Sequence, residues 1–324
     1  MMQMTLDRLE AAHALIRQVM PETPQYAWPL LARRTGSEVW VKHENHTPTG
    51  AFKVRGGIVF MDDLQRSGRK VRGVISATRG NHGQSVALAA TRAGLRSVIY
   101  VPHGNSMEKN AAMRALGAEL VEYGRDFDEA RAAALAAAET ENLEFLPSFH
   151  PSLVLGVATY ALELFRAATP LDAVYVPIGL GSGICGTIAV RDLLGLKADV
   201  IGVVSERADA YARSFEVGRV IPTASADTFA DGMAVRQPDP AALDIIRRGA
   251  ARVVRVTEAQ IAQAIRAYFQ DTHNVAEGAG AAPLAALLEE REIMSGKRVG
   301  LILSGGNIDT ERYAAILTGS QSDH

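Results

Sequence analysis

The sequence predicts an α/β protein with two lobes, each built around a mainly parallel sheet that helices cover on both faces. Short apolar runs alternate along the chain with longer helical patterns, and this alternation is typical of right-handed crossovers between parallel strands. The chain has 324 residues, of which 48% are hydrophobic. Such a chain exceeds the usual size of one hydrophobic core, so we expect two lobes.

The predicted strands are short apolar runs, which is the pattern of strands buried in a parallel sheet. In chain order they are centred on Val39, Val74, Val98, Leu120, Val174, Ile201, Val253 and Leu301. Helical patterns lie between them, and the alanine-rich stretch from Phe127 to Thr140 is predicted to be a helix by propensity. We find no internal repeat and no low-complexity linker.

Composition agrees with a soluble enzyme, and the cytoplasm is the expected compartment. The formal net charge is −2 with intermixed signs, which argues against a nucleic acid or an anionic membrane as the partner. The first ten residues lack the apolar core of a signal peptide, and no stretch reaches membrane-spanning length. Cys185 is the only cysteine, so no intrachain disulfide can form, which fits a reducing compartment.

Lys53 is the first candidate for chemistry. It lies among small, turn-forming and aromatic residues in the segment from Thr47 to Gly57, just after the apolar run 39–41. A lysine that is partly desolvated at a strand-to-helix turn can lose its proton and attack a carbonyl. An ordinary solvated lysine is the alternative.

Two later turns are suited to anions. The segment from Ser76 to Gln84 precedes a helical run, and donors there include backbone N–H groups and the side chains of Thr78, Asn81 and His82, which suits a carboxylate. The segment 177–186 has four glycines and a serine after a buried-strand pattern, so its backbone can fold around a phosphate at a helix start.

Ser304 ends the strongly apolar strand of segment 299–308. The carboxyl ends of strands in an open parallel sheet converge on the ligand crevice, so Ser304 should lie near whatever the glycine loop holds. Its hydroxyl is then placed to reach a ring nitrogen.

Together these motifs resemble a known family. Five segments follow one another in a fixed order: the Lys53 segment, the turn 79–84, the glycine loop, residues 230–233 and residues 304–307. In this order they resemble the threonine and serine dehydratases, which are fold-type II pyridoxal-phosphate enzymes of the tryptophan synthase β-like group. The resemblance extends from about Thr23 to Ile308 and implies two doubly wound lobes with pyridoxal 5'-phosphate in the cleft between them.

The resemblance also implies roles for single residues. Lys53 would form a Schiff base with the cofactor, Phe52 would pack against one face of its ring, and Asn81 would donate to its phenolic oxygen. Ser304 would contact the pyridine nitrogen, and Gly232 would leave room on the other face. The cofactor phosphate would be held mainly by the backbone amides of Gly179, Leu180, Gly181, Ser182 and Gly183.

The implied reaction is an α,β-elimination of water from a β-hydroxy-α-amino acid, which gives a 2-oxo acid and ammonia. The Lys53 amine would remove the α-proton. The substrate carboxylate would lie on the turn formed by Thr78, Arg79, Gly80, Asn81 and His82. Threonine, serine, 3-hydroxyaspartate and phenylserine share the reacting atoms, and the sequence does not choose between them. We expect a homodimer or a higher homo-oligomer.

Arg79 departs from the family pattern. Serine racemases carry a serine here that reprotonates the opposite face of the substrate, and an arginine that stays charged is a poor general acid. Racemisation, the alternative reaction of the same fold, is therefore disfavoured. Two roles for Arg79 stay open: an external salt bridge, or a guanidinium that binds the α-carboxylate or a second substrate carboxylate.

A second departure concerns metal. Related metal-activated enzymes carry a glutamate and an aspartate where this chain has Val204 and Ala210. Hard cations need several oxygen ligands, so we predict no divalent metal site. Glu206 and Asp209 lie close by, and a solvated helix start is their expected role.

Other interpretations stay open. The glycine loop matches a dinucleotide-binding fingerprint, with Glu206 about twenty residues further on. An NAD-dependent oxidoreductase is the alternative from another class, although it leaves the Lys53 and Asn81 segments without a task. A protein that binds a ligand without turnover is the third. Glu277 either matches a family position near the cofactor ring or serves as a helix-start acid.

The resemblance places a small lobe at residues 68–151, inserted into a large lobe made of residues 1–67 and 152–324. The residues after Ile308 are too few for the regulatory domain of allosteric threonine dehydratases. Feedback through such a domain is therefore not expected.

Overall fold

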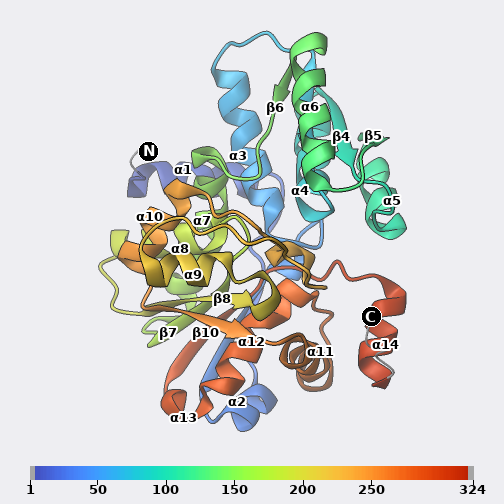
Figure 1. Cartoon of the computed structure of the whole chain (residues 1–324). Coiled ribbons are helices and arrows are strands. Elements are labelled where there is room, and N and C mark those ends of the chain that lie inside the picture. The colour runs from blue at the N-terminus through green and yellow to red at the C-terminus, as the bar shows by residue number, and fades with distance from the viewer. Residues whose placement is uncertain (1–3, 320–324) are drawn as a thin grey trace.

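The computed structural model describes residues 4–319, which form two sheets of unequal size (Figure 1). The larger sheet has six strands in the order β1-β2-β10-β7-β8-β9. These are β1 (Gln25–Ala27), β2 (Glu38–His43), β7 (Ala173–Pro177), β8 (Asp199–Ser205), β9 (Arg252–Val256) and β10 (Arg298–Leu303). All neighbouring pairs are parallel except β1 with β2.

The smaller sheet has four parallel strands in the order β5-β4-β3-β6. These are β3 (Gly73–Ala77), β4 (Arg96–Val101), β5 (Glu119–Glu122) and β6 (Leu143–Phe145). The predicted α/β fold is confirmed, and every predicted strand centre lies in a strand. The sequence did not predict β1 or β6, because three residues are too few to show an alternating pattern.

Helices cover both sheets. Those of the larger lobe are α1 (Leu6–Arg17), α2 (Pro29–Thr35), α7 (Pro151–Ala168), α8 (Ser182–Leu193), α9 (Ala210–Val217), α10 (Pro240–Gly249), α11 (Glu258–Thr272), α12 (Gly278–Glu289), α13 (Arg291–Met294) and α14 (Thr310–Thr318), with 3-10 turns η1 (Glu44–His46), η2 (Glu206–Ala208) and η3 (Asp231–Met233). Those of the smaller lobe are α4 (Asn81–Arg92), α5 (Met107–Ala115) and α6 (Phe127–Glu141). Helix α6 confirms the alanine-rich prediction and begins where the Asp126 side chain accepts from two backbone N–H groups.

The two faces of the larger sheet form separate cores, because successive side chains of a strand point to opposite faces. In β7, Val174 and Val176 pack with residues of α1, α7, α8 and α10. Ala173 and Tyr175 of the same strand pack with residues of α11 and α12. Helices on both faces are what a buried parallel sheet requires.

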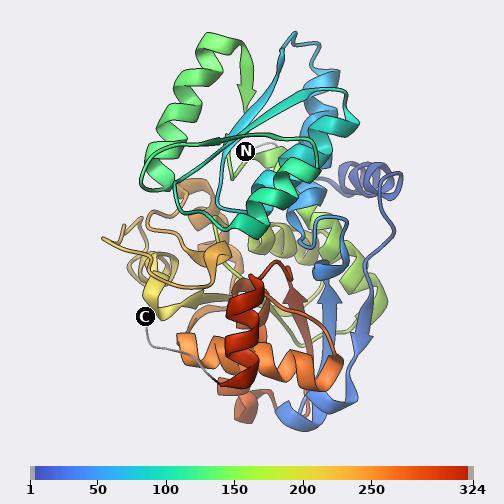
Figure 2. The same ribbon diagram turned by 90° about the vertical axis from the view of Figure 1, so that its right-hand side faces the viewer.

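Helix α3 (Lys53–Arg66) connects the lobes, and the smaller lobe stands above the larger one in Figures 1 and 2. Val54 and Ile58, near its start, pack in the core of the larger lobe, whereas Phe60 and Leu64 pack in the smaller one. We propose lobe boundaries at residues 68 and 151, which is supported by the smaller sheet lying wholly between residues 73 and 145. No helix within residues 4–319 is both long and apolar enough to cross a bilayer.

Candidate active site

A cavity of about 580 Å³ lies where the ends of β3, β7 and β10 meet the start of α3. The carboxyl ends of parallel strands are the usual place for a ligand in open α/β sheets. All residues predicted for the cofactor and substrate line it: Phe52, Lys53, Thr78, Arg79, Gly80, Asn81, His82, Gly179, Leu180, Gly181, Ser182, Gly183, Gly232 and Ser304. The fold therefore brings segments far apart in sequence to one place.

Lys53 is the first residue of α3, at the floor of this cavity. Its position is fixed on both sides: the Phe52 N–H donates to Ser304 O (3.0 Å), and the Ser85 hydroxyl donates to Lys53 O (2.7 Å). The amine lies 5.1 Å from the centre of the Phe52 ring. Burial lowers the pKa of Lys53 to about 8, although the Glu277 carboxylate acts in the opposite direction. Near neutral pH a useful fraction of this amine is unprotonated.

The glycine loop presents free backbone donors to the cavity. The first hydrogen bond of α8 runs from the Cys185 N–H to Gly181 O (2.9 Å), so the N–H groups of residues 182–184 have no helical acceptor. Gly181 is left-handed, with φ of 101°. A Cβ on Gly179 would lie 2.3 Å from the Gly232 carbonyl oxygen, so only glycine fits there. The Tyr160 hydroxyl supports the loop by donating to Gly183 O (3.0 Å).

The turn between β3 and α4 is a second set of donors. The Gly80 N–H donates to Thr78 Oγ1 (3.1 Å), and the first helical bond runs from Gln84 N–H to Gly80 O (3.3 Å). The N–H groups of residues 81–83 therefore lie before the helical ladder. His82 is buried with Nε2 3.4 Å from Leu146 O, and burial lowers its pKa to about 3, so its ring is neutral.

Asn81 lies at the centre of a polar network that faces the cavity. Its amide donates to both oxygens of the Glu277 carboxyl group (2.8 and 3.0 Å), and its Oδ1 accepts from the Asn307 amide (2.8 Å). Asn307 also donates to Thr49 O (2.8 Å). Glu277 is the N-cap of α12, and burial raises its pKa to about 7 against the effects of Asn81 and Lys109. Glu277 is thus both a helix-start residue and a cavity residue.

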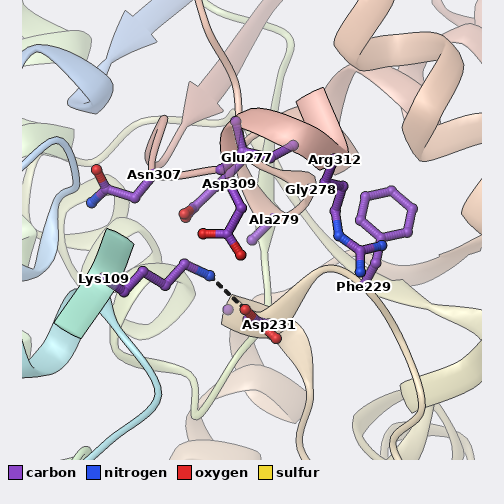
Figure 3. Close-up of a pocket in the computed structure, with 11 residues that line it drawn as sticks. Lys109, Phe229, Asp231, Glu277, Gly278, Ala279, Asn307, Asp309 and Arg312 are labelled. Carbon is purple, nitrogen blue, oxygen red and sulfur yellow. Dashed lines mark hydrogen bonds and ion pairs between the residues drawn. The ribbon is translucent and has the colours of Figure 1, made fainter. Parts of the chain in front are cut away.

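Lys109 is a cavity residue that the sequence did not predict. Its amine donates to Asp231 Oδ2 (2.5 Å), and Figure 3 shows it directed at Asp231, below Glu277 and Asp309. Burial would lower the pKa of Lys109, but Asp231 and the other two carboxylates raise it, so the amine stays protonated. A Cβ on Gly80 would lie 3.0 Å from the Lys109 stem. No motif surrounds Lys109, so only the packing of α5 against the cavity reveals it.

Two arginines at the cavity differ in their contacts. Arg236 pairs with Asp126 and Asp128 at the start of α6, and so joins the two lobes at the cavity mouth. The sequence did not single out Arg236. Arg79 is exposed, and within residues 4–319 its side chain has neither a hydrogen bond nor an ion pair.

The region expected to lack a metal site is occupied by ion pairs. Val204 lies in β8 just before its last residue, Ser205, and Ala210 begins α9; neither Val204 nor Ala210 has a side-chain oxygen. Asp209 accepts from Arg213 (2.7 Å) and Arg255 (3.1 Å), so two guanidinium groups already use its carboxylate. The absence of a divalent metal remains a prediction.

A second group, His13, Glu22 and Glu163, has three possible ligand atoms within 4.8 Å of one another. However, Glu163 already accepts from Lys42 (2.6 Å) and from Arg55 (2.8 Å). Because two cations use this carboxylate, it is a poor ligand for a third.

Comparison with known proteins gives the family. Residues 16–305 match the family of pyridoxal-phosphate dependent enzymes. The chain belongs to this family. Its cofactor is therefore pyridoxal phosphate, as the resemblance implied, and the NAD alternative has lost its basis.

This pyridoxal-phosphate enzyme is 34% identical over 314 residues to an L-threonine ammonia-lyase of Thermotoga maritima, covering 97% of this chain and 78% of that one. It is 33% identical over 298 residues to an L-threo-3-hydroxyaspartate ammonia-lyase of a Pseudomonas species, covering 92% and 93%. A crystal structure of a pyridoxal 5'-phosphate-dependent aspartate racemase matches with a TM-score of 0.90 at 27% identity, covering 97% and 98%. These matches confirm the threonine/serine dehydratase-like resemblance and the fold-type II architecture.

The cavity fits this cofactor. A desolvated amine, a glycine loop with unpaired N–H groups and a buried hydroxyl at Ser304 line a single cavity. The amine suits the aldehyde of the cofactor, and the N–H groups of the glycine loop suit its phosphate. The Ser304 hydroxyl suits its pyridine nitrogen. The close approach of Gly179 to the Gly232 carbonyl oxygen leaves no room for a side chain in this loop.

Proposed function

We propose that the chain is a dehydratase that eliminates water from a β-hydroxy-α-amino acid and yields a 2-oxo acid and ammonia. The observation that carries this proposal is the Lys53 amine, which is desolvated at the floor of a cavity that also holds two separate anion-binding turns. Ammonia-lyases among the relatives support the same reaction class. Threonine, serine, 3-hydroxyaspartate and phenylserine all remain candidate substrates.

We assign the cofactor contacts as follows. Lys53 Nζ would bind the aldehyde carbon of the cofactor, and Phe52 would flank its ring. Backbone N–H groups of residues 179–183 would bind the phosphate, with the dipole of α8 favouring its charge. Ser304 offers a hydroxyl to the ring nitrogen, and a hydroxyl stabilises a protonated ring less than a carboxylate does. Asn81 offers its amide to the phenolic oxygen, and Gly232 keeps the opposite face clear.

When bound, pyridoxal phosphate withdraws electrons from the α-carbon of an attached amino acid, which makes its proton acidic and lets a β-hydroxyl leave. The turn 78–82 holds the substrate carboxylate through the N–H groups at the start of α4. Lys53 Nζ, whose pKa is lowered by burial, would be the base that takes the α-proton. The product leaves as an enamine, becomes an imine and is hydrolysed in water.

Racemisation is the weaker candidate, although an aspartate racemase shares the fold. A racemase needs a second proton-transfer group on the face opposite Lys53. The side chain that this chain offers on the turn is the guanidinium of Arg79, and a guanidinium is a poor donor or acceptor of protons. Lys109, the other cavity lysine, is paired with Asp231, which raises its pKa and holds it protonated.

The test is to reduce the cofactor-loaded protein with borohydride and to locate the pyridoxyl group by peptide mass spectrometry. We expect it on the peptide that contains Lys53. Lys53→Ala should abolish the adduct and lower the rate of 2-oxo acid formation at least about 10²-fold. Lys109→Ala is the matched control: it removes the other cavity lysine and should keep the adduct on Lys53. A pyridoxyl group on Lys109, or on no lysine, would contradict the proposal.

We also propose that the enzyme acts in the cytoplasm as a homodimer or a higher homo-oligomer. The single cysteine, Cys185, is buried and unpaired, which supports a reducing compartment. Light scattering of the purified protein gives the oligomeric state. A monomer at micromolar concentration would contradict the expectation.

A further inference from the structure

Cationic and acidic side chains line the cavity in equal numbers. Four cationic side chains line it, namely Lys53, Arg79, Lys109 and Arg236, and four acidic ones do, namely Asp126, Asp128, Asp231 and Glu277. His82 adds no charge because burial keeps its ring neutral. The formal sum of these side chains is therefore zero before any ligand enters.

Most of these charges already have partners. Lys109 is paired with Asp231 at 2.5 Å, and Arg236 is paired with Asp126 and Asp128. The Lys53 amine is assigned to the cofactor. Arg79 is the remaining cation, and the structure between residues 4 and 319 offers its guanidinium neither an ion pair nor a hydrogen bond.

The α-carboxylate of a substrate does not need this guanidinium. The turn that carries Arg79 also presents the unpaired N–H groups of residues 81–83 at the start of α4. The α-carboxylate that these N–H groups would bind is present in every amino-acid substrate. The Arg79 guanidinium beside them is a second anion-binding group on the same turn. Its planar set of N–H donors can form two parallel hydrogen bonds with a second carboxylate.

We propose that Arg79 determines specificity by binding a carboxylate attached to the β-carbon, so that the preferred substrate class is a β-hydroxy-α-amino dicarboxylate. This inference rests on the proposed function. A neutral β-substituent such as methyl or phenyl gains nothing from a guanidinium. It also leaves this cation without a partner at the cavity.

Charge favours the same class of substrate. The cofactor phosphate and the α-carboxylate both add negative charge to a cavity whose side chains, Arg79 included, sum to zero. A second carboxylate would be repelled there without a cation of its own. Arg79 supplies that cation from the rim, where the side chain is exposed and pays little desolvation before the substrate arrives.

The test compares two substrates in three variants. For the wild type, kcat/KM for threo-3-hydroxyaspartate should exceed that for threonine. Arg79→Gln should lower kcat/KM for hydroxyaspartate about 10- to 100-fold, the range for a charge-assisted hydrogen bond, and change that for threonine less than about twofold. Arg79→Lys should restore part of the loss. Arg236→Gln removes an equal charge from the same cavity and should change both substrates by the same factor.

Equal loss on both substrates in Arg79→Gln would mean that Arg79 binds the α-carboxylate, and it would overturn the inference. No loss on either, or a wild type that prefers threonine, would also overturn it. A wild type that carries the Lys53 adduct but consumes no β-hydroxy amino acid would instead refute the proposed function. The two failures are therefore distinguishable.

A binding experiment gives a readout without turnover. Succinate and butyrate are titrated into the cofactor-loaded enzyme by calorimetry, because they differ by one carboxylate. We expect the wild type to bind succinate at least about tenfold more tightly, and Arg79→Gln to lose that difference. Equal affinity of the two acids for the wild type would count against a second carboxylate site.

Discussion

Three side chains of the cavity have pKa values shifted by desolvation, and together they determine which groups can move a proton. The pKa of Lys53 falls to about 8 and that of His82 to about 3, whereas that of Glu277 rises to about 7. In each case desolvation disfavours the charged form. Near neutrality, therefore, the Lys53 amine and the Glu277 carboxyl both exchange protons readily, while the His82 ring stays neutral.

Glu277 makes the unliganded protein less stable as pH rises. Its folded pKa of about 7 lies above the ordinary value of 4.5, so between these values the folded chain holds a proton that the unfolded chain has released. The contribution of this group to the free energy of unfolding therefore falls from pH 4.5 to about 7 and is constant above. The full difference is at most about 3 kcal/mol.

We expect Glu277→Gln to be more stable than the wild type at pH 8, with the difference vanishing below pH 4.5. Denaturant unfolding of the cofactor-free protein across this range measures it. Glu289→Gln, at an exposed position of the same helix, should show no such trend. A variant whose advantage does not depend on pH would show that the Glu277 carboxyl is not strained by burial.

The sequence could predict some of these residues and not others. Lys53, the glycine loop and Ser304 lie at strand ends within recognisable turns, so pattern alone brings them to one crevice. Lys109 and Arg236 contribute through packing between lobes, which no local pattern reports. Glu277 could be placed at a helix start, but its raised pKa depends on burial that only the fold provides.

Among the elements, α3 is held by a buried ionic network two residues after Lys53. Arg55 is fully buried, and its guanidinium donates to Glu44 (2.7 and 2.9 Å), to Glu163 (2.8 and 2.8 Å) and to the hydroxyls of Thr23 and Thr159 (3.2 and 2.9 Å). These carboxylates raise the pKa of Arg55, and the Arg55 guanidinium helps to lower that of Glu163. The start of α3, and with it Lys53, is thereby fixed to the larger lobe.

Arg55→Met should therefore lower the free energy of unfolding by about 3–5 kcal/mol, because it leaves the buried carboxylate of Glu44 without a cation and leaves Glu163 with Lys42 in place of two cations. Arg66→Met on the same helix is the control: that side chain is 75% exposed and pairs only with Asp62, so a change within about 0.5 kcal/mol is expected. Urea unfolding curves measure both. Similar effects of the two substitutions would argue against the network as the anchor.

The loop before α8 depends on close backbone approach. In Gly179→Ala the new methyl carbon would lie 2.3 Å from the Gly232 oxygen, so backbone on both sides of the cofactor must shift. We expect at least a tenfold loss of cofactor affinity, measured by absorbance titration. Gly249→Ala places a methyl carbon 2.2 Å from Ile188 Cγ2 instead, away from the cavity. It should reduce stability and leave cofactor affinity within about twofold.

At the scale of the whole molecule, polar contacts around the cavity join the two lobes. Lys109 of α5 pairs with Asp231 of η3, and Arg236 pairs with two acids at the start of α6. Lys109→Met should leave Asp231 unpaired and increase hydrogen exchange of amides 231–233 about tenfold. Lys70→Met, at an exposed position, should leave these rates unchanged. Unchanged exchange in Lys109→Met would show that other contacts hold the lobes.

The overall architecture was predictable because one sequence pattern, an apolar strand next to a helical stretch, recurs along the chain. Long parallel strands that are mostly apolar, such as β8 and β10, are followed or preceded by a helical pattern, and handedness rules then limit the topology. The antiparallel edge strand β1 has no such pattern, because its pairing with β2 depends on tertiary packing and not on local sequence. The lobe boundaries could be predicted only from the family resemblance, because no stretch with the composition of a linker marks them in the sequence.

Cys185 gives the protein a built-in probe of its cofactor loop. The thiol is buried near the start of α8, next in sequence to the N–H groups of residues 182–184 that we propose bind the phosphate, and burial raises its pKa. A thiol that is both inaccessible and protonated reacts with alkylating reagents only when this turn opens. Since the chain has one cysteine, the rate at which this thiol is labelled would measure how often the first turn of α8 opens, without any engineered label site.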